Sequence, residues 1–299
     1  MRTLIETLKK AEEKKVALGH FNIAGFEQLQ AVVNVARRLD LPVIIGVSEG
    51  EREYLGVRRV RDLADSYNAE YGNPNAKWGF WLFVNADHTH DLQKAENAAS
   101  AGFDAVLFDG GKLPFEEDIE ETKKAVALVK GKNKHALVEG EMGYIGTSSE
   151  VWDKLPEGAA IEEKDLTKSE DAKKFVEATG VDMLAPAVGN VHGMFKNASN
   201  PRINIKRIGE IKKATGVPLV LHGGSGIEDE DFISAIEAGI NIVHISTEIR
   251  RAWRESLDAA LKGEPDEVAP YHLMPKVIEA MERVIEDRLR LFNKLGNES

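Results

Sequence analysis

Eight short apolar runs recur along the chain, and longer stretches with an amphipathic pattern separate most of them. The runs are mostly unbroken rather than alternating and are rich in Val, Ile and Leu, which is typical of strands buried on both faces of a parallel sheet. The amphipathic stretches repeat their apolar positions at helical spacing, and several carry basic residues in the last turn. The runs span 16–21, 42–47, 80–84, 104–108, 135–140, 182–187, 218–222 and 241–245. The clearest helical stretches span 26–39, 116–129, 169–179, 204–215 and 228–239, and residues 92–103 also look helical.

This alternation predicts an α/β fold, and the count of eight favours a closed (β/α)8 TIM barrel formed by residues 1–299 as a single domain. The alternative is an open doubly wound sheet, which usually carries G-x-G-x-x-G after its first strand; GHFNIAGF at 19–26 lacks that spacing. Two segments stand outside the repeat. Residues 147–167 fit no helix or strand, so 144–167 is predicted to be a mobile active-site loop, and 271–295 is predicted to be an additional C-terminal helix.

Composition narrows the classes of function. The net charge of −11 argues against general nucleic-acid binding, which needs basic patches. The absence of cysteine excludes disulfides, thiolate nucleophiles and Cys-based zinc sites, so a metal would need His, Asp, Glu or backbone oxygen. No segment approaches the roughly 20 apolar residues of a membrane span. The N-terminal MRTLIETLKKAEEKKVA is charged throughout, unlike a signal peptide, so a cytoplasmic protein is expected.

Histidines gather where the predicted strands end, which in a barrel is the mouth that holds the active site. Six of the eight histidines lie there, whereas His135 and His272 do not. A single buried histidine is more often structural, but packing does not favour one rim, so the distribution predicts a metal site. His88, His192 and His222 follow three different strands, and three neutral imidazoles with an open fourth position suit catalytic zinc. The six are His20, His88, His90, His192, His222 and His244.

Two further features lie at the same mouth. Asp87 precedes His88, and its residue type fits either a general acid/base or a hydrogen-bond partner that holds a ligand histidine. HGGSG at 222–226 leaves backbone N–H groups accessible, and Ser246-Thr247 precede a helix that begins near Glu248. Because the loops after strands seven and eight commonly hold phosphate in this fold, the sequence predicts a phosphate site here.

The order and spacing of these segments resemble class II, metal-dependent fructose-bisphosphate aldolases and their tagatose-bisphosphate relatives. The similarity runs from about residue 16 to 295. The matching segments are GHFNIAGFEQLQAVV, PVIIGVSEG, the DH of NADHTH, AGFDAVLFDGGKLPFEEDIEETKKAV, VEGEMGYIG, APAVGNVHGMFK, PLVLHGGSGI and STEIRRAW.

The resemblance implies reversible, zinc-dependent cleavage of fructose 1,6-bisphosphate to dihydroxyacetone phosphate and glyceraldehyde 3-phosphate, a step of glycolysis and gluconeogenesis. His88, His192 and His222 would hold Zn²⁺, Asp87 would act as acid/base at the aldehyde oxygen, and Glu150 lies nearest the position of the loop glutamate that serves as the enolisation base. Asp109 and Glu141 match positions that hold a second or displaced divalent ion, Asn22 and Ser48 line the substrate site, and Gly193, Gly223, Gly224, Ser225, Ser246 and Thr247 would bind a phosphate. The family also implies a monovalent cation (Na⁺ or K⁺) near the phosphate and a homodimer or homotetramer.

Some positions depart from the family pattern. His244 replaces an Asn that contacts substrate, which leaves tagatose bisphosphate or another ketose phosphate open as the substrate. Ile242, Gly111 and Thr89 replace the usual Lys, Ser and Gly, and His90 has no counterpart. None of these changes removes a metal ligand.

Other chemistries are less compatible with the residues. No apolar run contains or directly ends in Lys, which disfavours a Schiff-base mechanism. An amidohydrolase would need H-x-H on the first strand and Asp on the last, whereas HTH at 88–90 follows the third run. A non-catalytic barrel that binds a metal or a sugar phosphate would keep the histidines and GGSG but would not need Asp87.

Overall fold

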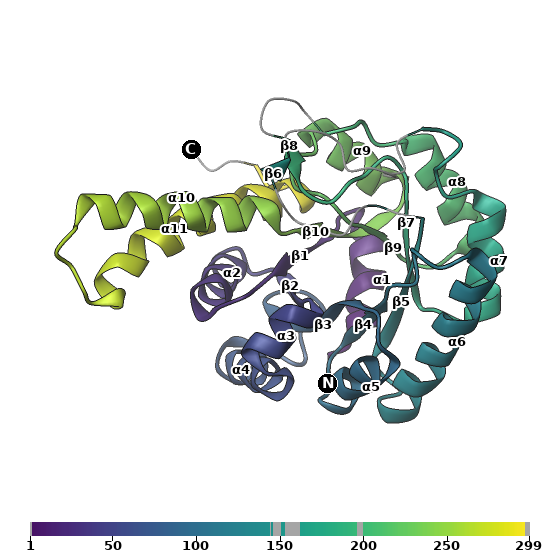
Figure 1. The fold of residues 1–299 in the computed structure, drawn as a ribbon, viewed down its shortest axis with the longest axis horizontal. Helices are drawn as coiled ribbons and strands as arrows, with labels where there is room; N and C mark the ends of the chain where they lie inside the picture. The colour runs from purple at the N-terminus through teal and green to yellow at the C-terminus, as the bar shows by residue number, and fades with distance from the viewer. Residues whose placement is uncertain (1, 144, 146–150, 153–161, 196–199, 297–299) are drawn as a thin grey trace.

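The computed structural model describes residues 2–143, 145, 151–152, 162–195 and 200–296, and it contains a closed barrel of parallel strands (Figure 1). Around the barrel the strand order is β1-β10-β9-β7-β5-β4-β3-β2, so consecutive barrel strands are neighbours and the last pairs with the first. The predicted TIM-barrel fold is therefore confirmed. The strands are β1 (Leu18–Asn22), β2 (Pro42–Val47), β3 (Trp81–Thr89), β4 (Ala105–Phe108), β5 (Leu137–Met142), β7 (Met183–Pro186), β9 (Leu219–Leu221) and β10 (Ile240–Ile245).

Helices surround the barrel, and those predicted from periodicity lie within a few residues of the observed bounds. Three helices were not predicted, and capping boxes start two of them: Thr3 accepts from the Glu6 N–H ahead of α1, and Ser48 accepts from the Glu51 N–H ahead of α3. The T-x-x-E and S-x-x-E patterns were the sequence signals for these starts. The unpredicted helices are α1 (Leu4–Lys14), α3 (Glu49–Leu55) and α4 (Val57–Tyr71); the others before the C-terminal pair are α2 (Phe26–Arg38), α5 (Leu92–Ser100), α6 (Phe115–Lys132), α7 (Ser169–Thr179), α8 (Ile205–Thr215) and α9 (Asp229–Ala238).

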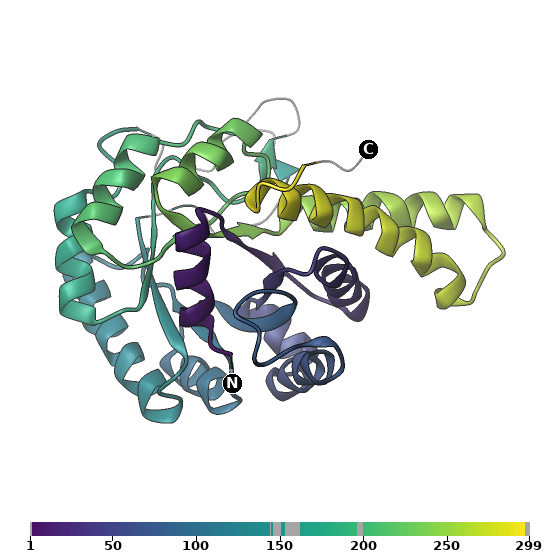
Figure 2. The same ribbon diagram turned by 180° about the vertical axis from the view of Figure 1, so that it is seen from behind.

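The barrel interior has an apolar lower layer and a polar upper layer. Leu18, Phe83 and Ile242 point inward near the N-terminal ends of the strands, where they pack against Leu4 and Leu8 of α1. Figure 2 shows α1 across this end of the barrel. Because side chains alternate along a strand, the residues two positions further on also point inward. There the interior becomes polar, and its buried members are His20, Asn85, Glu139, His222 and His244.

The last two helices form an arm that projects away from the barrel (Figure 1). Helix α11 returns along α10 and packs on α2 through buried residues at helical spacing, which include Val277, Met281 and Ile285. Within the described residues, no helix is both long enough and apolar enough to span a bilayer. The arm consists of α10 (Thr247–Gly263) and α11 (Pro270–Phe292).

The expectation that 147–167 contains no regular element was wrong at one point. Val151–Trp152 forms strand β6, which pairs in parallel with β8 (Met194–Phe195). A two-residue strand is too short to produce a periodic apolar pattern, so the sequence could not reveal it. Residues 144, 146–150 and 153–161 of the predicted loop lie outside the described residues.

Candidate active site

Strand β3 carries a bulge that turns two consecutive side chains into the barrel mouth. On this strand Leu82, Val84 and Ala86 pack outward against the helices, so strict alternation would also turn His88 outward. The β3–β4 register instead shifts between Ala86 and Thr89, and His88 adopts a left-handed φ of 38°. Such bulges commonly redirect a side chain next to an active site. As a result Asp87 and His88 both line the same pocket, and β3 runs to Thr89, further than the apolar run that ends at 84.

Three imidazoles from different loops and strands surround one point. The ring centroid of His88 lies 4.9 Å from that of His192 and 5.0 Å from that of His222, and the last two are 5.6 Å apart. Potential ligand atoms of these three residues and of Glu141 all lie within 4.8 Å of one another. The predicted histidine cluster is thus present as one compact set of nitrogen and oxygen donors.

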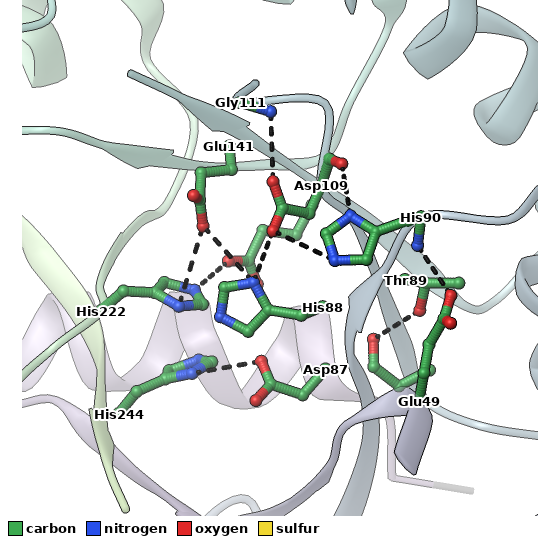
Figure 3. Close-up of polar contacts among 12 residues, drawn as sticks. Glu49, Asp87, His88, Thr89, His90, Asp109, Gly111, Glu141, His222 and His244 are labelled. Carbon is green, nitrogen blue, oxygen red and sulfur yellow. Dashed lines mark hydrogen bonds and ion pairs between the residues drawn. The ribbon is translucent and has the colours of Figure 1, made fainter. Parts of the chain in front are cut away.

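Carboxylate side chains lie next to the histidines of this cluster (Figure 3). Asp109 Oδ2 lies 2.7 Å from His88 Nδ1, and Glu139 Oε1 lies 2.8 Å from His222 Nε2. The second contact resembles the carboxylate–histidine pairs that orient metal ligands. Glu141 Oε2 lies 3.8 Å from His88 Nδ1 and 4.0 Å from His222 Nδ1. Neither Glu141 Oε2 nor His222 Nδ1 has a hydrogen-bond partner among the described residues.

Burial and the nearby carboxylates shift the pKa values of the residues in this cluster. Burial raises the pKa of Glu141 well above its usual value, and the nearby Asp109 adds to this shift. Burial lowers the pKa of His222 to about 3, so its imidazole is neutral and has a free lone pair. Burial opposes the charge on His88, but Asp87 and the hydrogen-bonded Asp109 outweigh it and raise the pKa of His88 to about 10. The site therefore favours positive charge at its centre.

Asp87 lies beside the cluster, where a hydrogen bond from Asn22 holds its carboxylate. Its Oδ2 accepts from Asn22 Nδ2 at 2.8 Å, and its Oδ1 lies 3.6 Å from His244 Nδ1. Burial would raise the pKa of Asp87, but the positive charge of His88 outweighs burial and lowers it well below the usual range. The ring of His244 stacks on His20 with centroids 3.4 Å apart. Asp87 is therefore an ionised carboxylate held at the pocket wall.

The residues of the predicted anion site come together where β9 and β10 end. Gly223 has a φ of 61°, and a Cβ there would lie 2.3 Å from the carbonyl oxygen of Val191, so only glycine fits this close approach. Ser225 Oγ accepts from the N–H groups of Ser246 and Glu248, each at 3.3 Å. These contacts place the loop at the N-terminus of α10, where the helix dipole favours an anion.

The predicted residues share one pocket of about 310 Å³. Glu141 and His222 lie buried beneath it, and Glu150 lies outside the described residues. Sequence reasoning missed Arg250, which lines the pocket and pairs with Glu51 Oε1 at 2.6 Å, because this contact joins residues 199 positions apart. The predicted residues that line the pocket are Asn22, Ser48, Asp87, His88, Asp109, His192, Gly193, Gly223, Gly224, Ser225, His244, Ser246 and Thr247.

Asp118, at the start of α6, supports the loop beside Asp109. It is 4% exposed, and its Oδ1 accepts from Thr122 Oγ1 at 2.9 Å. A Cβ on Gly110 would lie 2.0 Å from the same Oδ1, so the carboxyl packs directly on this loop. Burial raises the pKa of Asp118 from 3.8 to about 6.

We expect Asp118→Asn to stabilise the protein at pH 7. As pH rises from about 4 to 6, the unfolded chain releases the Asp118 proton before the folded protein does, so the wild type loses stability that the Asn variant keeps. The shift corresponds to a gain of about 1–3 kcal/mol in the free energy of unfolding. Urea unfolding of both proteins should show this gain at pH 7 and almost none at pH 4. An equal difference at the two pH values would contradict the interpretation.

Comparison with known proteins gives a consistent set of similarities. The profile of the family described as "Fructose-bisphosphate aldolase class-II" matches residues 2–297. A "Probable fructose-bisphosphate aldolase" from Bacillus subtilis is 33% identical over 97% of this chain and 96% of its own, and a "Sulfofructosephosphate aldolase" from Alkalicoccus urumqiensis is 32% identical over 95% and 94%. Among solved structures, the YdjI aldolase from Escherichia coli K12 is similar with a TM-score of 0.80, at 29% identity and full coverage of both chains.

Proposed function

The chain belongs to the class II fructose-bisphosphate aldolase family of metal-dependent lyases, and on that premise we propose that it cleaves fructose 1,6-bisphosphate reversibly to dihydroxyacetone phosphate and glyceraldehyde 3-phosphate. The observation that carries the proposal is the meeting of His88, His192 and His222 beside the glycine-lined anion site. A metal centre next to a phosphate site is the arrangement that this reaction requires.

The donor set fits Zn²⁺. His88, His192 and His222 would hold the ion, because three imidazoles that leave a further position open are typical of catalytic zinc. Glu141 and Asp109 supply carboxylate oxygens for a second or displaced divalent ion. The orphaned Glu141 Oε2 and His222 Nδ1 support this assignment, since buried polar atoms rarely lack partners. When bound, the ion acts as a Lewis acid that stabilises the negative charge left on the ketone half of the substrate.

Asp87 would move the proton that cleavage requires. Its ionised carboxylate accepts the proton of the C4 hydroxyl, the C3–C4 bond breaks, and C4 becomes the aldehyde carbon. The electron pair remains on the dihydroxyacetone phosphate half as an enediolate, which takes up a proton at C3. We propose Glu150 as the donor of this proton on the basis of the family resemblance. Asn22 holds the carboxylate of Asp87 through its hydrogen bond of 2.8 Å.

The pocket lining supplies groups for two phosphates. Gly193, Gly223, Gly224 and Ser225, with Ser246 and Thr247 at the start of α10, would bind one phosphate. Ser48 and Arg250 line the same pocket, and the Arg250 side chain is 40% exposed, so its guanidinium is accessible to a second anion. Binding energy from both phosphate contacts would orient the bond that breaks.

A different ketose phosphate is the second candidate substrate. One of the similar proteins is named a sulfofructosephosphate aldolase, and His244 stands in the pocket where the family usually has Asn. Either observation is consistent with a changed sugar or a changed terminal anion.

Release of dihydroxyacetone phosphate from each candidate sugar tests the proposal. The purified protein is assayed with fructose 1,6-bisphosphate, tagatose 1,6-bisphosphate and sulfofructose phosphate, before and after prolonged chelation. We expect the highest kcat/KM with fructose 1,6-bisphosphate, loss of activity on chelation and recovery with Zn²⁺. A tenfold preference for another sugar would reassign the substrate, and activity that survives chelation would contradict the metal mechanism.

A further inference from the structure

The bulge of β3 at Asp87 and His88 lies beyond the end of the neighbouring strand β2. The β2–β3 pairing ends at Val47 and Ala86, so β2 offers no further ladder partner to Asp87. His88 follows with its left-handed φ of 38°, a conformation that residues other than glycine adopt only uncommonly. A strained residue of this kind persists only where its surroundings determine its conformation.

A buried guanidinium supplies the missing contacts. Arg52, in the last turn of α3, is 3% exposed. Its Nη1 donates to the carbonyl oxygens of Val47 at 2.6 Å and Asp87 at 3.0 Å, and its Nη2 donates to Thr89 Oγ1 at 2.9 Å. One planar group therefore contacts the residues on both sides of His88 and ties them to the end of β2.

Thr89 is suited to this contact. It is fully buried, so its hydroxyl has few other partners; besides accepting from Arg52 it approaches the Ala86 carbonyl oxygen at 3.4 Å. Replacement of the hydroxyl by a methyl group would leave Nη2 of Arg52 without this acceptor. Arg52 and Thr89 together therefore hold the bulge, which lies between Ala86 and Thr89.

We infer that Arg52 is a positioning residue, which through Thr89 and the Asp87 carbonyl fixes the backbone that directs His88 to the metal and Asp87 to the substrate. This inference rests on the proposed function. Among the described residues, Arg52 donates its hydrogen bonds to two backbone carbonyls and one hydroxyl rather than to the side chains of Asp87 or His88. A lysine cannot make the same set of hydrogen bonds, because its ammonium group is a point charge on a flexible chain rather than a planar set of donors.

The Zn²⁺ affinity of Arg52 and Thr89 variants tests the inference. It is measured by competition with a chromophoric chelator, and kcat is measured on the same proteins. Residues that orient a metal ligand typically change affinity or activity by about 10–100-fold when mutated, so we expect Arg52→Lys to weaken Zn²⁺ binding within that range. Thr89→Val should weaken it by about 10-fold, at the lower end of the same range. Thr89→Ser, which keeps the hydroxyl, should bind Zn²⁺ as the wild type does. The double variant should be no weaker than Arg52→Lys alone, because both changes remove the same hydrogen bond.

Arg61→Lys is the matched control. Arg61 is also a buried arginine, but it pairs with Asp104 at 2.7 Å outside the barrel mouth, so its variant should keep wild-type Zn²⁺ affinity even if it unfolds at lower temperature. Wild-type affinity in both Thr89→Val and Arg52→Lys would overturn the inference, as would additive losses in the double variant. If Arg52→Lys fails to fold, Thr89→Val against Thr89→Ser decides alone. A wild-type protein that binds no Zn²⁺ would instead refute the proposed function.

Discussion

Asp87→Asn is expected to lower kcat for aldol cleavage by about 10²–10⁴-fold while Zn²⁺ stays bound, since general acid–base catalysis contributes this much. Asn has nearly the same shape and still accepts a hydrogen bond from Asn22, but it cannot accept the proton of the C4 hydroxyl. The metal donors of His88, His192 and His222 are unchanged, so Zn²⁺ affinity should shift far less than turnover. Steady-state kinetics and the zinc content of the purified variant provide the two measurements.

Asp118→Asn is the control for the chemical change itself. Asp118 is also a buried aspartate, but it packs on the β4–α6 loop and does not line the pocket, so its Asn variant should retain the wild-type kcat. Wild-type kcat in Asp87→Asn would show that a group other than Asp87 moves the proton. A variant that loses zinc and activity together would instead make Asp87 part of the metal site.

The second large effect is expected for His222→Ala. His222 is fully buried beneath the pocket and belongs to the donor set, so its removal should weaken Zn²⁺ binding by more than about 100-fold, beyond the effect typical of a residue that only orients a ligand. Cleavage activity should fall with it at ordinary zinc concentrations. Glu139→Gln, which keeps the shape of the residue that orients His222, should show a smaller loss of about 10–100-fold.

His272→Ala provides the comparison for this prediction, because His272 is half exposed and pairs with Glu267 on the arm, far from the donor set in the chain. Its zinc affinity and activity should equal those of the wild type. Since Glu139 loses its partner in His222→Ala, circular dichroism should first establish that this variant is folded. Zinc binding at wild-type affinity by folded His222→Ala would refute the proposed ligand set.

The sequence predicted the barrel because its strands are apolar on both faces. Unbroken runs such as 42–47 and 104–108 are distinct from the helical pattern around them, and their number determines the architecture. The helices α3 and α4 were missed because their stretch is rich in charge, although Val57, Val60, Ala64 and Tyr67 recur at helical spacing along α4. Helix α1 was read only as a charged N-terminus, although Thr3 and Glu6 carried a capping signal.

The site was predicted in its composition but not in its geometry. Histidines at the ends of successive strands must meet at one mouth once the barrel closes, so their proximity follows from topology. The inward turn of His88 does not follow, because strict alternation would point it toward the helices. The contacts of Arg52 and Arg250 with distant segments also depend on three-dimensional placement, which a one-dimensional pattern does not contain.

Because the β3 bulge takes its two functional side chains from consecutive residues, the separation between the proposed proton carrier and the metal ligand is set by a single peptide unit. Movement of the strand would carry Asp87 and His88 together. Adaptation to a sugar of another length or terminal group would then fall to the rim, at Ser48 and Arg250, which both contact Glu51. Enzymes of this kind can diversify their substrates by exchanging rim residues while the spacing of the reacting groups is inherited unaltered.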